Sequence, residues 1–192
     1  HIYLFSALAL QNVIKKFNFE IFDLINLNTH GGSLRYYIKR KNNKNISISS
    51  RVIKQIDNEK KMNLDKLSTY LKFAKNVVNS KSQLIKLLKH IKSKNKKIAG
   101  YGATAKATTV LNYCNINEQI IDFFTDTTPD KINKYMPGKK IKIINYSKKI
   151  LTNIDFVFLG AWNFKKEILF KEKNFIKKGG KFITHVPFPK VF

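Results

Sequence analysis

From Lys96 to the end of the chain, short apolar runs alternate with segments of helical character, and this alternation constrains the fold more than any other feature. The apolar runs predict strands over residues 97–100, 120–125, 141–145, 154–160 and 181–186. The segments between them predict helices over 104–114, 147–151 and 164–177. Strands that are apolar almost throughout are typical of a parallel sheet covered on both faces. We therefore predict a small doubly wound α/β domain.

The first predicted turn from strand to helix carries a glycine pattern. Residues 100–105 read Gly-Tyr-Gly-Ala-Thr-Ala, a form of G-x-G-x-x-A, and Asp126 ends the next strand, where a ribose-binding acid would lie. Glycines let the backbone approach a phosphate, and the helix N-terminus offers free N–H groups. Thr104 would add a hydroxyl and Lys106 a charge. The pattern makes the sheet Rossmann-like and favours a bound phosphate or nucleotide; close packing of helix on strand is the alternative explanation.

Aromatic and amide side chains follow the same edge of the predicted sheet. Ligands of open α/β sheets bind at the carboxyl ends of the strands. Tyr101 lies there, as do Trp162, Asn163 and Phe164 just after the fourth strand. A phenol, an indole and an amide beside a phosphate loop would suit a nucleotide-linked sugar. The alternative is that Trp162 and Phe164 only cap the core.

The N-terminal part of the chain has a different pattern. Residues 6–17 predict a short amphipathic helix with Ser6 as its N-cap. Residues 19–27 and 33–40 predict an antiparallel hairpin around the turn 28–32. Residues 41–62 are polar and basic and predict a loosely packed linker. Residues 63–93 predict one long helix with an apolar stripe for packing.

The net charge of +25 invites a nucleic-acid-binding hypothesis, since Lys and Arg total 37 against 12 acids. Arginine occurs only at Arg35, Arg40 and Arg51, so nearly all of the positive charge is lysine, and the lysines are dispersed. Lysine, asparagine and isoleucine are abundant together, as A·T-rich codons produce. We therefore disfavour nucleic acid as a partner.

Several other classes of site find little support. The single cysteine, Cys114, excludes a disulfide framework within the chain and a Cys-rich zinc site, and it is expected to be a small core residue. The histidines show no metal-ligand spacing, so no metal site is predicted; His90 should be solvated and His185 should pack. The longest apolar runs are too short to span a membrane, and no signal peptide is visible, so we expect a cytoplasmic protein without a membrane partner.

Two stretches identify a resemblance to a known family. Residues 29–35, Thr-His-Gly-Gly-Ser-Leu-Arg, resemble a motif of the S-adenosylmethionine-dependent sugar C-methyltransferases. Residues 100–114 resemble the start of that family's C-terminal domain, and Met136-Pro-Gly138 and residues 162–168 fit as well. These enzymes place a methyl branch on nucleotide-linked 4-keto deoxysugars.

The resemblance implies an architecture for the chain. Proteins of the family carry an N-terminal zinc-binding module, a class I methyltransferase domain and a Rossmann-like C-terminal domain. Residues 1–40 then correspond to the last helix and hairpin of the methyltransferase domain, 41–62 to a linker, and 63–192 to a long helix with the C-terminal domain. The chain starts at His1 and not Met, so we expect a fragment that lacks the zinc module and the S-adenosylmethionine-binding residues and is inactive alone.

The resemblance also implies roles for individual residues. His1 matches the last histidine of a family motif and would be the general base that removes the acidic C–H proton beside the sugar ketone. The nucleotide-sugar would lie between the methyltransferase and C-terminal domains. Substrate binding is assigned to residues of two motifs and one aromatic segment: Gly31, Gly32, Ser33, Tyr101, Gly102, Ala103, Thr104, Lys106 and Asn163.

Two rival functions remain. The glycine turn and Asp126 would also suit an NAD(P)-binding Rossmann module of an oxidoreductase, although the sequence shows no Tyr-Lys pair or cysteine placed for hydride chemistry. A basic nucleic-acid-binding protein would show a steep salt dependence of its affinity.

Overall fold

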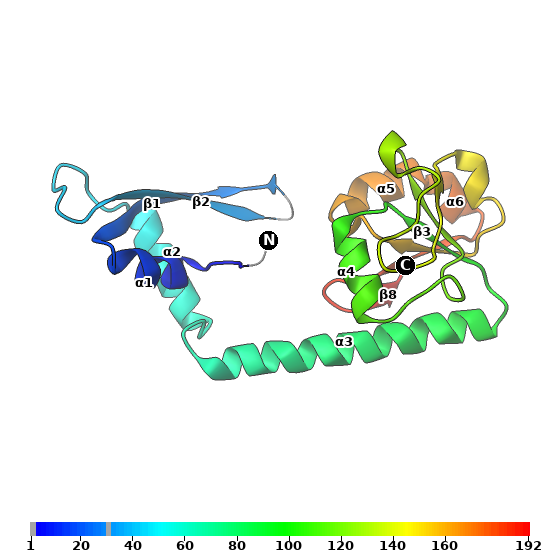
Figure 1. Cartoon of the computed structure of the whole chain (residues 1–192), viewed down its shortest axis with the longest axis horizontal. Helices are drawn as coiled ribbons and strands as arrows, with labels where there is room; N and C mark the ends of the chain where they lie inside the picture. The colour runs from blue at the N-terminus through cyan, green and yellow to red at the C-terminus, as the bar shows by residue number, and fades with distance from the viewer. Residues whose placement is uncertain (1–2, 30–31) are drawn as a thin grey trace. The chain divides into compact units, whose positions relative to one another are not determined.

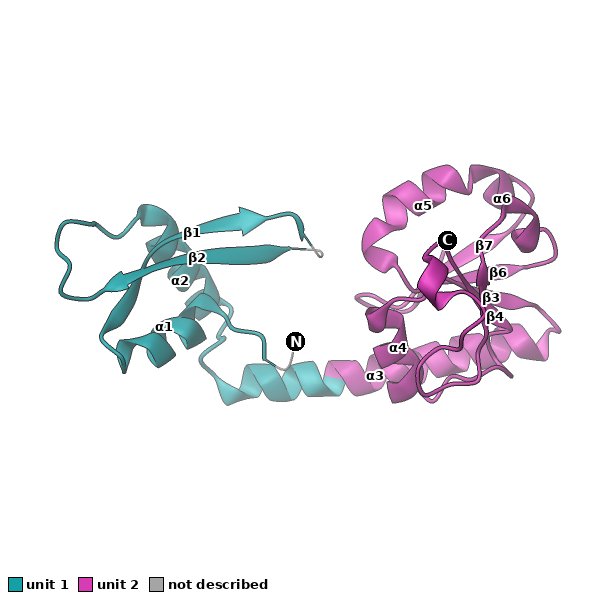
Figure 2. Cartoon of the chain, turned by 45° about the horizontal axis from the view of Figure 1, so that its top comes forward, with its two compact units in different colours: residues 1–75 teal, residues 76–192 magenta. Residues whose placement is uncertain are grey.

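A computed structural model describes residues 3–29 and 32–192 of the chain. The chain forms two compact units, residues 1–75 and residues 76–192 (Figure 2). In the described part of the chain, no helix is both long and apolar enough to cross a membrane.

The first unit begins with the helix and hairpin that the sequence predicts. Helix α1 (Ala7–Lys15) starts at Ser6, whose side chain accepts a hydrogen bond from the Ala9 N–H at 3.1 Å, so the predicted N-cap is confirmed. Strands β1 (Phe19–Leu27) and β2 (Ser33–Arg40) form the predicted antiparallel pair. A small core of Ala7, Ile21, Leu24 and Val52 lies between the hairpin and the helices.

The expected linker over residues 41–62 differs from the structure in its second half, which forms helix α2 (Ser50–Lys61). This helix packs against α1 and β1. The face that it turns inward carries Val52, Ile56 and Glu59, and one of these three side chains is charged. So short and mixed a stripe among lysines and asparagines gives a weak periodic signal, which is why the sequence did not predict the helix.

Glu59 fastens α2 to the start of α1. Its side chain is buried, and its two carboxylate oxygens accept hydrogen bonds from the backbone N–H groups of Ala7 at 2.9 Å and Leu8 at 2.8 Å. Gln55 donates to the same carboxylate at 2.9 Å. The first N–H groups of a helix have no partner within it, and a negative charge there is favoured by the helix dipole. A residue of α2 therefore caps a helix more than forty residues earlier in the chain.

The second unit is built on a six-stranded sheet in the order β5-β4-β3-β6-β7-β8. Figure 1 labels β3 and β8 of this sheet, and Figure 2 labels β3, β4, β6 and β7. The strands are β3 (Ile98–Tyr101), β4 (Phe123–Asp126), β5 (Ile143–Asn145), β6 (Phe156–Leu159), β7 (Lys181–Thr184) and β8 (Lys190–Val191). All neighbouring strands are parallel except β7 and β8. The order reverses between β3 and β6, as in a Rossmann fold, so the predicted doubly wound sheet is confirmed.

Helices cover both faces of this sheet. They are the C-terminal part of α3 (Leu67–Ser93), α4 (Ala105–Tyr113), α5 (Lys165–Lys171) and α6 (Lys173–Lys177), with 3-10 turns η2 (Pro129–Lys131), η3 (Lys148–Leu151) and η4 (Trp162–Phe164). The apolar stripe predicted along α3 is buried at Leu84, Leu88 and Ile91 and exposed at Leu67, Leu71 and Val78, so the packing predicted for it holds only for its second half. Phe158 of β6 belongs to the core beneath α3 and α4, whereas its neighbours Val157 and Leu159 belong to a second core beneath α5. Alternate residues of one strand thus serve opposite cores, which explains why the strand is apolar throughout.

Three details of the second unit differ from the sequence prediction. The helix expected over 164–177 is interrupted at Glu172, which separates α5 from α6. The short helix expected over 147–151 is a 3-10 turn, and the two-residue edge strand β8 was not predicted. The 3-10 turn and β8 are too short for their periodicity to be measured from the sequence.

Two acids fix the beginning of the central strand β3. Asp122 accepts a hydrogen bond from the Ile98 N–H at 3.0 Å, and Asp155 accepts one from the Lys97 N–H at 2.9 Å. Lysines pair with the same carboxylates, Lys92 with Asp122 and Lys96 with Asp155. The strand that bears the glycine turn is therefore held from both neighbouring strands.

Replacing Glu59 with alanine should destabilise the first unit. The change leaves the buried N–H groups of Ala7 and Leu8 without an acceptor, and we expect its opening free energy to fall by about 2 kcal/mol, as for hydrogen bonds to a charged group. Hydrogen exchange of the hairpin amides measures the loss, and amides of the second unit serve as an internal reference. The control Asp57→Ala removes an exposed acid from the same helix. An equal loss in both variants would show that the cap is not responsible.

Candidate functional site

The glycine turn lies at the carboxyl end of β3, where the strand order reverses. Gly102 has a φ of +83°, a conformation that L side chains rarely adopt. A Cβ at this position would lie 2.7 Å from the Cβ of Ala161, which follows β6. The Gly102 N–H donates to the Thr125 carbonyl at 2.8 Å. The second glycine of the motif is therefore required by backbone conformation and by close packing together.

Gly160 and Thr104 complete this close approach. A Cβ at Gly160 would overlap the Gly102 carbonyl oxygen, so the loops after β3 and β6 touch through their backbones. The Thr104 hydroxyl donates to the Gly160 carbonyl at 2.9 Å and accepts from the Ala107 N–H at 3.2 Å, which makes Thr104 the N-cap of α4. The hydroxyl that we expected to be offered to a ligand is thus already engaged in the turn.

Asp126, the expected ribose-binding acid, is directed at the turn itself. Its carboxylate accepts hydrogen bonds from the N–H groups of Ala103 at 2.8 Å and Thr128 at 2.9 Å, and Lys131 lies 3.3 Å away. Burial raises the pKa of this carboxyl, but the hydrogen bonds from Thr128, Lys131 and Ala103 outweigh burial, so that its pKa lies below the ordinary 3.8. Asp126, which the sequence suggested for binding the ribose of a dinucleotide, instead stabilises the glycine turn.

The start of α4 keeps donors for an anion. Gly102, Ala103 and Thr104 donate their N–H groups within the protein. The next two, those of Ala105 and Lys106, belong to the first turn of the helix, whose N–H groups lack intrahelical partners. The Lys106 ammonium lies 5.2 Å from the centre of the Trp162 ring. The positive end of the helix dipole and Lys106 together favour negative charge here.

A cavity of about 380 Å³ opens beside the turn. It is lined by residues from the ends of β3, β4, β5 and β6 and from α5: Tyr101, Gly102, Thr104, Thr125, Asp126, Thr127, Lys131, Tyr146, Ala161, Phe164, Glu167, Ile168 and Lys171. Three residues assigned from the sequence, Tyr101, Gly102 and Thr104, are brought together in its wall. Ala103 is buried behind it, and Asn163 lies in η4 outside the lining.

Two tyrosines of the lining share a buried carboxylate. Tyr101 donates its hydroxyl proton to Glu172 Oε1 at 2.9 Å, and Tyr146 donates to the same oxygen at 2.5 Å. The two rings meet edge to face with 5.4 Å between their centres. Burial, followed by the hydrogen bond with Glu172 and its charge, raises the pKa of Tyr101 and raises that of Tyr146 to about 12. Both phenols are therefore protonated donors at neutral pH.

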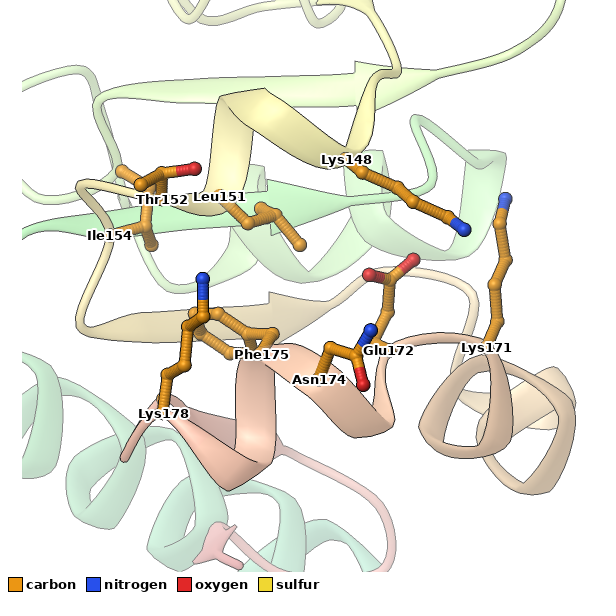
Figure 3. Close-up of a pocket in the computed structure, with 10 residues that line it drawn as sticks. Lys148, Leu151, Thr152, Ile154, Lys171, Glu172, Asn174, Phe175 and Lys178 are labelled. Carbon is orange, nitrogen blue, oxygen red and sulfur yellow. The ribbon is translucent and has the colours of Figure 1, made fainter.

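Glu172 lines a second, smaller cavity of about 210 Å³ (Figure 3). Its lining includes Lys148, Lys171, Asn174 and Phe175. Figure 3 labels both Glu172 and Lys171 among the residues that line this cavity. Lys171 also lines the larger cavity. The ammonium of Lys171 also lies 3.8 Å from the centre of the Tyr146 ring.

Two of the residues assigned in the first unit, Gly32 and Ser33, lie where the hairpin turn enters β2. Gly32 has a φ of +116° and donates its N–H to the Thr29 carbonyl at 2.9 Å, and the Ser33 hydroxyl contacts the same carbonyl at 3.3 Å. Both residues line an open cavity of about 600 Å³ with Leu4 and Phe5. His1 and Gly31, which were also assigned, lie outside the described residues.

His90, Cys114 and His185 lie outside the lining of the larger cavity. His90 is exposed and Cys114 is buried in the core, as predicted. His185 is buried and stacked on Phe158 with 5.2 Å between ring centres, and burial lowers its pKa to about 4. Within residues 3–29 and 32–192, no group of three or more His, Cys, Asp or Glu side chains could hold a metal ion.

Sequence reasoning missed Lys131, Tyr146, Lys171 and Glu172. Tyr146 directly follows a predicted strand, so the rule that ligands bind at the carboxyl ends of strands could have found it. Glu172 stands between two lysines in the segment predicted as a continuous helix, where an acid is ordinarily solvated. Its burial depends on the break between α5 and α6, and nothing in the sequence signals that break.

Comparisons with known proteins identify the family of the chain. The sequence model of the C-methyltransferase C-terminal domain matches residues 28–187. Over 191 residues, the chain is 29% identical to the C-methyltransferase NovU of Streptomyces niveus. The alignment covers all of this chain and 45% of NovU, so the chain spans about half the length of that relative.

Replacing Gly102 with alanine should destabilise the second unit more than Gly179→Ala does. Both glycines have positive φ values, +83° and +90°, but a Cβ at Gly179 would meet open space. The conformational cost of about 1 kcal/mol is therefore shared. Overlap with Ala161 should add about 2 kcal/mol in Gly102→Ala. Urea unfolding followed by the fluorescence of Trp162 measures both; equal losses would contradict close packing at the turn.

The contribution of Asp126 to stability should depend on pH. Because its folded pKa is depressed, this contribution is complete above the ordinary value of 3.8 and is lost as the pH falls through the folded value. We expect Asp126→Asn to lower the unfolding free energy by about 1 kcal/mol at pH 7. The gap between the two proteins should narrow at pH 3 in urea titrations, and a gap independent of pH would contradict the assignment.

Proposed function

Because the chain belongs to the C-methyltransferases and matches the C-terminal domain of that family, we propose that its second unit binds the nucleotide part of a nucleotide-linked sugar. The cavity beside the glycine turn is the binding site in this proposal. Its position at the carboxyl ends of β3, β4 and β5, next to the start of α4, is the observation that carries it.

The chemistry of the cavity supports a phosphate-bearing ligand. Lys131 and Lys171 line it, and the free N–H groups of α4 begin at its edge. The rings of Tyr101 and Tyr146 and the side chain of Phe164 offer flat apolar surface for a base or a sugar. The volume of about 380 Å³ is within the usual range of small-molecule sites.

We further propose that the sugar is a 4-keto deoxysugar that receives a methyl group on carbon. A ketone acidifies the neighbouring C–H, and a neutral imidazole can accept that proton near pH 7, which is the role proposed for His1. The enolate carbon formed on the sugar is then the nucleophile. A role in substrate binding is also proposed for Gly31, Gly32 and Ser33.

S-adenosylmethionine is the proposed methyl donor, and it supplies an electrophilic methyl group when bound. The acid that follows the glycine turn of residues 100–106, Asp126, is committed to Ala103 and Lys131. These residues do not fit an adenosyl cofactor, so we assign none of its contacts, and none of zinc, to them. The same engagement of Asp126 removes the support for an NAD(P) site.

Binding of a nucleoside diphosphate to the full chain tests the proposal. We expect isothermal titration at 150 mM salt to detect uridine or thymidine diphosphate with higher affinity than NADH. Lys131→Met and Lys171→Met should each weaken that binding about tenfold, the equivalent of 1.4 kcal/mol. Each variant keeps the apolar stem of the lysine and loses its charge.

The control Lys140→Met removes an exposed charge away from the cavity. Equal weakening by all three variants would show that the net charge of the chain attracts the ligand, and the cavity would then lose its role. Tight NADH binding with no affinity for the nucleoside diphosphates would favour the oxidoreductase alternative. An affinity that falls steeply with salt for any polyanion would favour a nucleic-acid partner.

A further inference from the structure

Glu172 is the buried acid at the junction of α5 and α6, and it is 4% exposed. A carboxylate in such a place is costly unless hydrogen bonds satisfy it. Here one oxygen accepts the phenolic protons of Tyr101 and Tyr146, which come from the ends of two different strands. The carboxylate therefore connects three parts of the second unit that are far apart in the sequence.

We propose that Glu172 is a positioning residue of the nucleotide cavity, acting through the two tyrosine rings that form part of its wall. This inference rests on the proposed function of the cavity. Tyr101 and Tyr146 line the cavity, whereas Glu172 does not, so Glu172 makes no direct contact with a ligand there and is proposed to act through its neighbours.

The backbone next to Tyr101 makes this positioning effective. Tyr101 is the last residue of β3 and directly precedes Gly102, whose close contact with Ala161 holds the turn. Tyr146 follows β5, its N–H donates to the Asp126 carbonyl at 3.1 Å, and Lys171 lies over its ring. The backbone beside each ring is thus anchored, and the shared carboxylate fixes the angle at which the two rings meet.

The hydrogen bonds to Glu172 also set the polarity of the wall. A phenol has one proton, and each of these tyrosines donates its proton to Glu172. Toward any other group, both hydroxyl oxygens can act only as acceptors. An acceptor matches an N–H of a base or a hydroxyl of a sugar, and it does not match a phosphate oxygen. We therefore assign the base or sugar to the tyrosine wall and the phosphates to the lysines and the start of α4.

The test compares two ligands in the full chain, uridine diphosphate and inorganic pyrophosphate. Glu172→Gln should weaken the binding of uridine diphosphate about tenfold and leave that of pyrophosphate unchanged, because the amide holds the rings less well while the lysines remain. Tyr146→Phe and Tyr101→Phe should show the same selective loss. If Glu172→Gln does not fold, the two phenylalanine variants carry the test, since they keep both rings.

Two controls separate positioning from stability. Glu118→Gln makes the same substitution at an exposed site in the same unit, and Ile116→Val loosens the buried core away from the cavity. Both should bind the two ligands like the unmodified chain, although Ile116→Val lowers the melting temperature. If Glu172→Gln and the phenylalanine variants lower the melting temperature but bind uridine diphosphate normally, Glu172 has only a structural role and the inference is wrong.

The outcomes distinguish this inference from the proposed function. If the unmodified chain binds neither ligand, the cavity is not a nucleotide site and the proposed function fails first. If it binds both and Glu172→Gln weakens both equally, the carboxylate does not act through the tyrosine wall. Selective loss of uridine diphosphate is the result that supports the inference.

Discussion

The second unit depends on the contact between two backbone turns that leaves no room for side chains. Gly160, after β6, lies against the carbonyl of Gly102, after β3, at the point where the order of the sheet reverses. Thr104 bonds across the same contact and caps α4, so the helix can start only where the two strands meet. The place of the cavity follows from this contact, because its walls are the strand ends that the contact brings together.

Carboxylates accept the hydrogen bonds that connect the segments around this contact. Asp126 binds the N–H of Ala103 in the turn, while Asp122 and Asp155 bind the N–H groups at the start of β3. Glu172 joins two tyrosines, and in the first unit Glu59 caps α1. The chain has 12 acids against 37 basic residues, so these five are a large share of its negative charge.

The parts of the fold that the sequence predicted are those that depend on local pattern. Apolar runs predicted the parallel strands because both of their faces are buried, and Ser6 predicted the start of α1 because an N-cap acts within one turn. Helix α2 was missed because Glu59 occupies one of its few inward positions. The wall of the cavity was half predicted: Tyr101 and Gly102 follow from the turn, whereas Glu172 contacts Tyr101 only because α5 ends where it does. Contacts between residues 71 positions apart leave no periodic trace in the chain.

The scarcity of acids gives this protein an uneven tolerance of sequence change. Most lysines are exposed and dispersed, so exchanging one for asparagine or isoleucine alters little locally. Each anchoring aspartate or glutamate has its own set of donors, and none of its neighbours can replace it. Substitutions toward lysine and asparagine should therefore be tolerated over most of the exposed surface. The five anchoring carboxylates should not tolerate such substitutions.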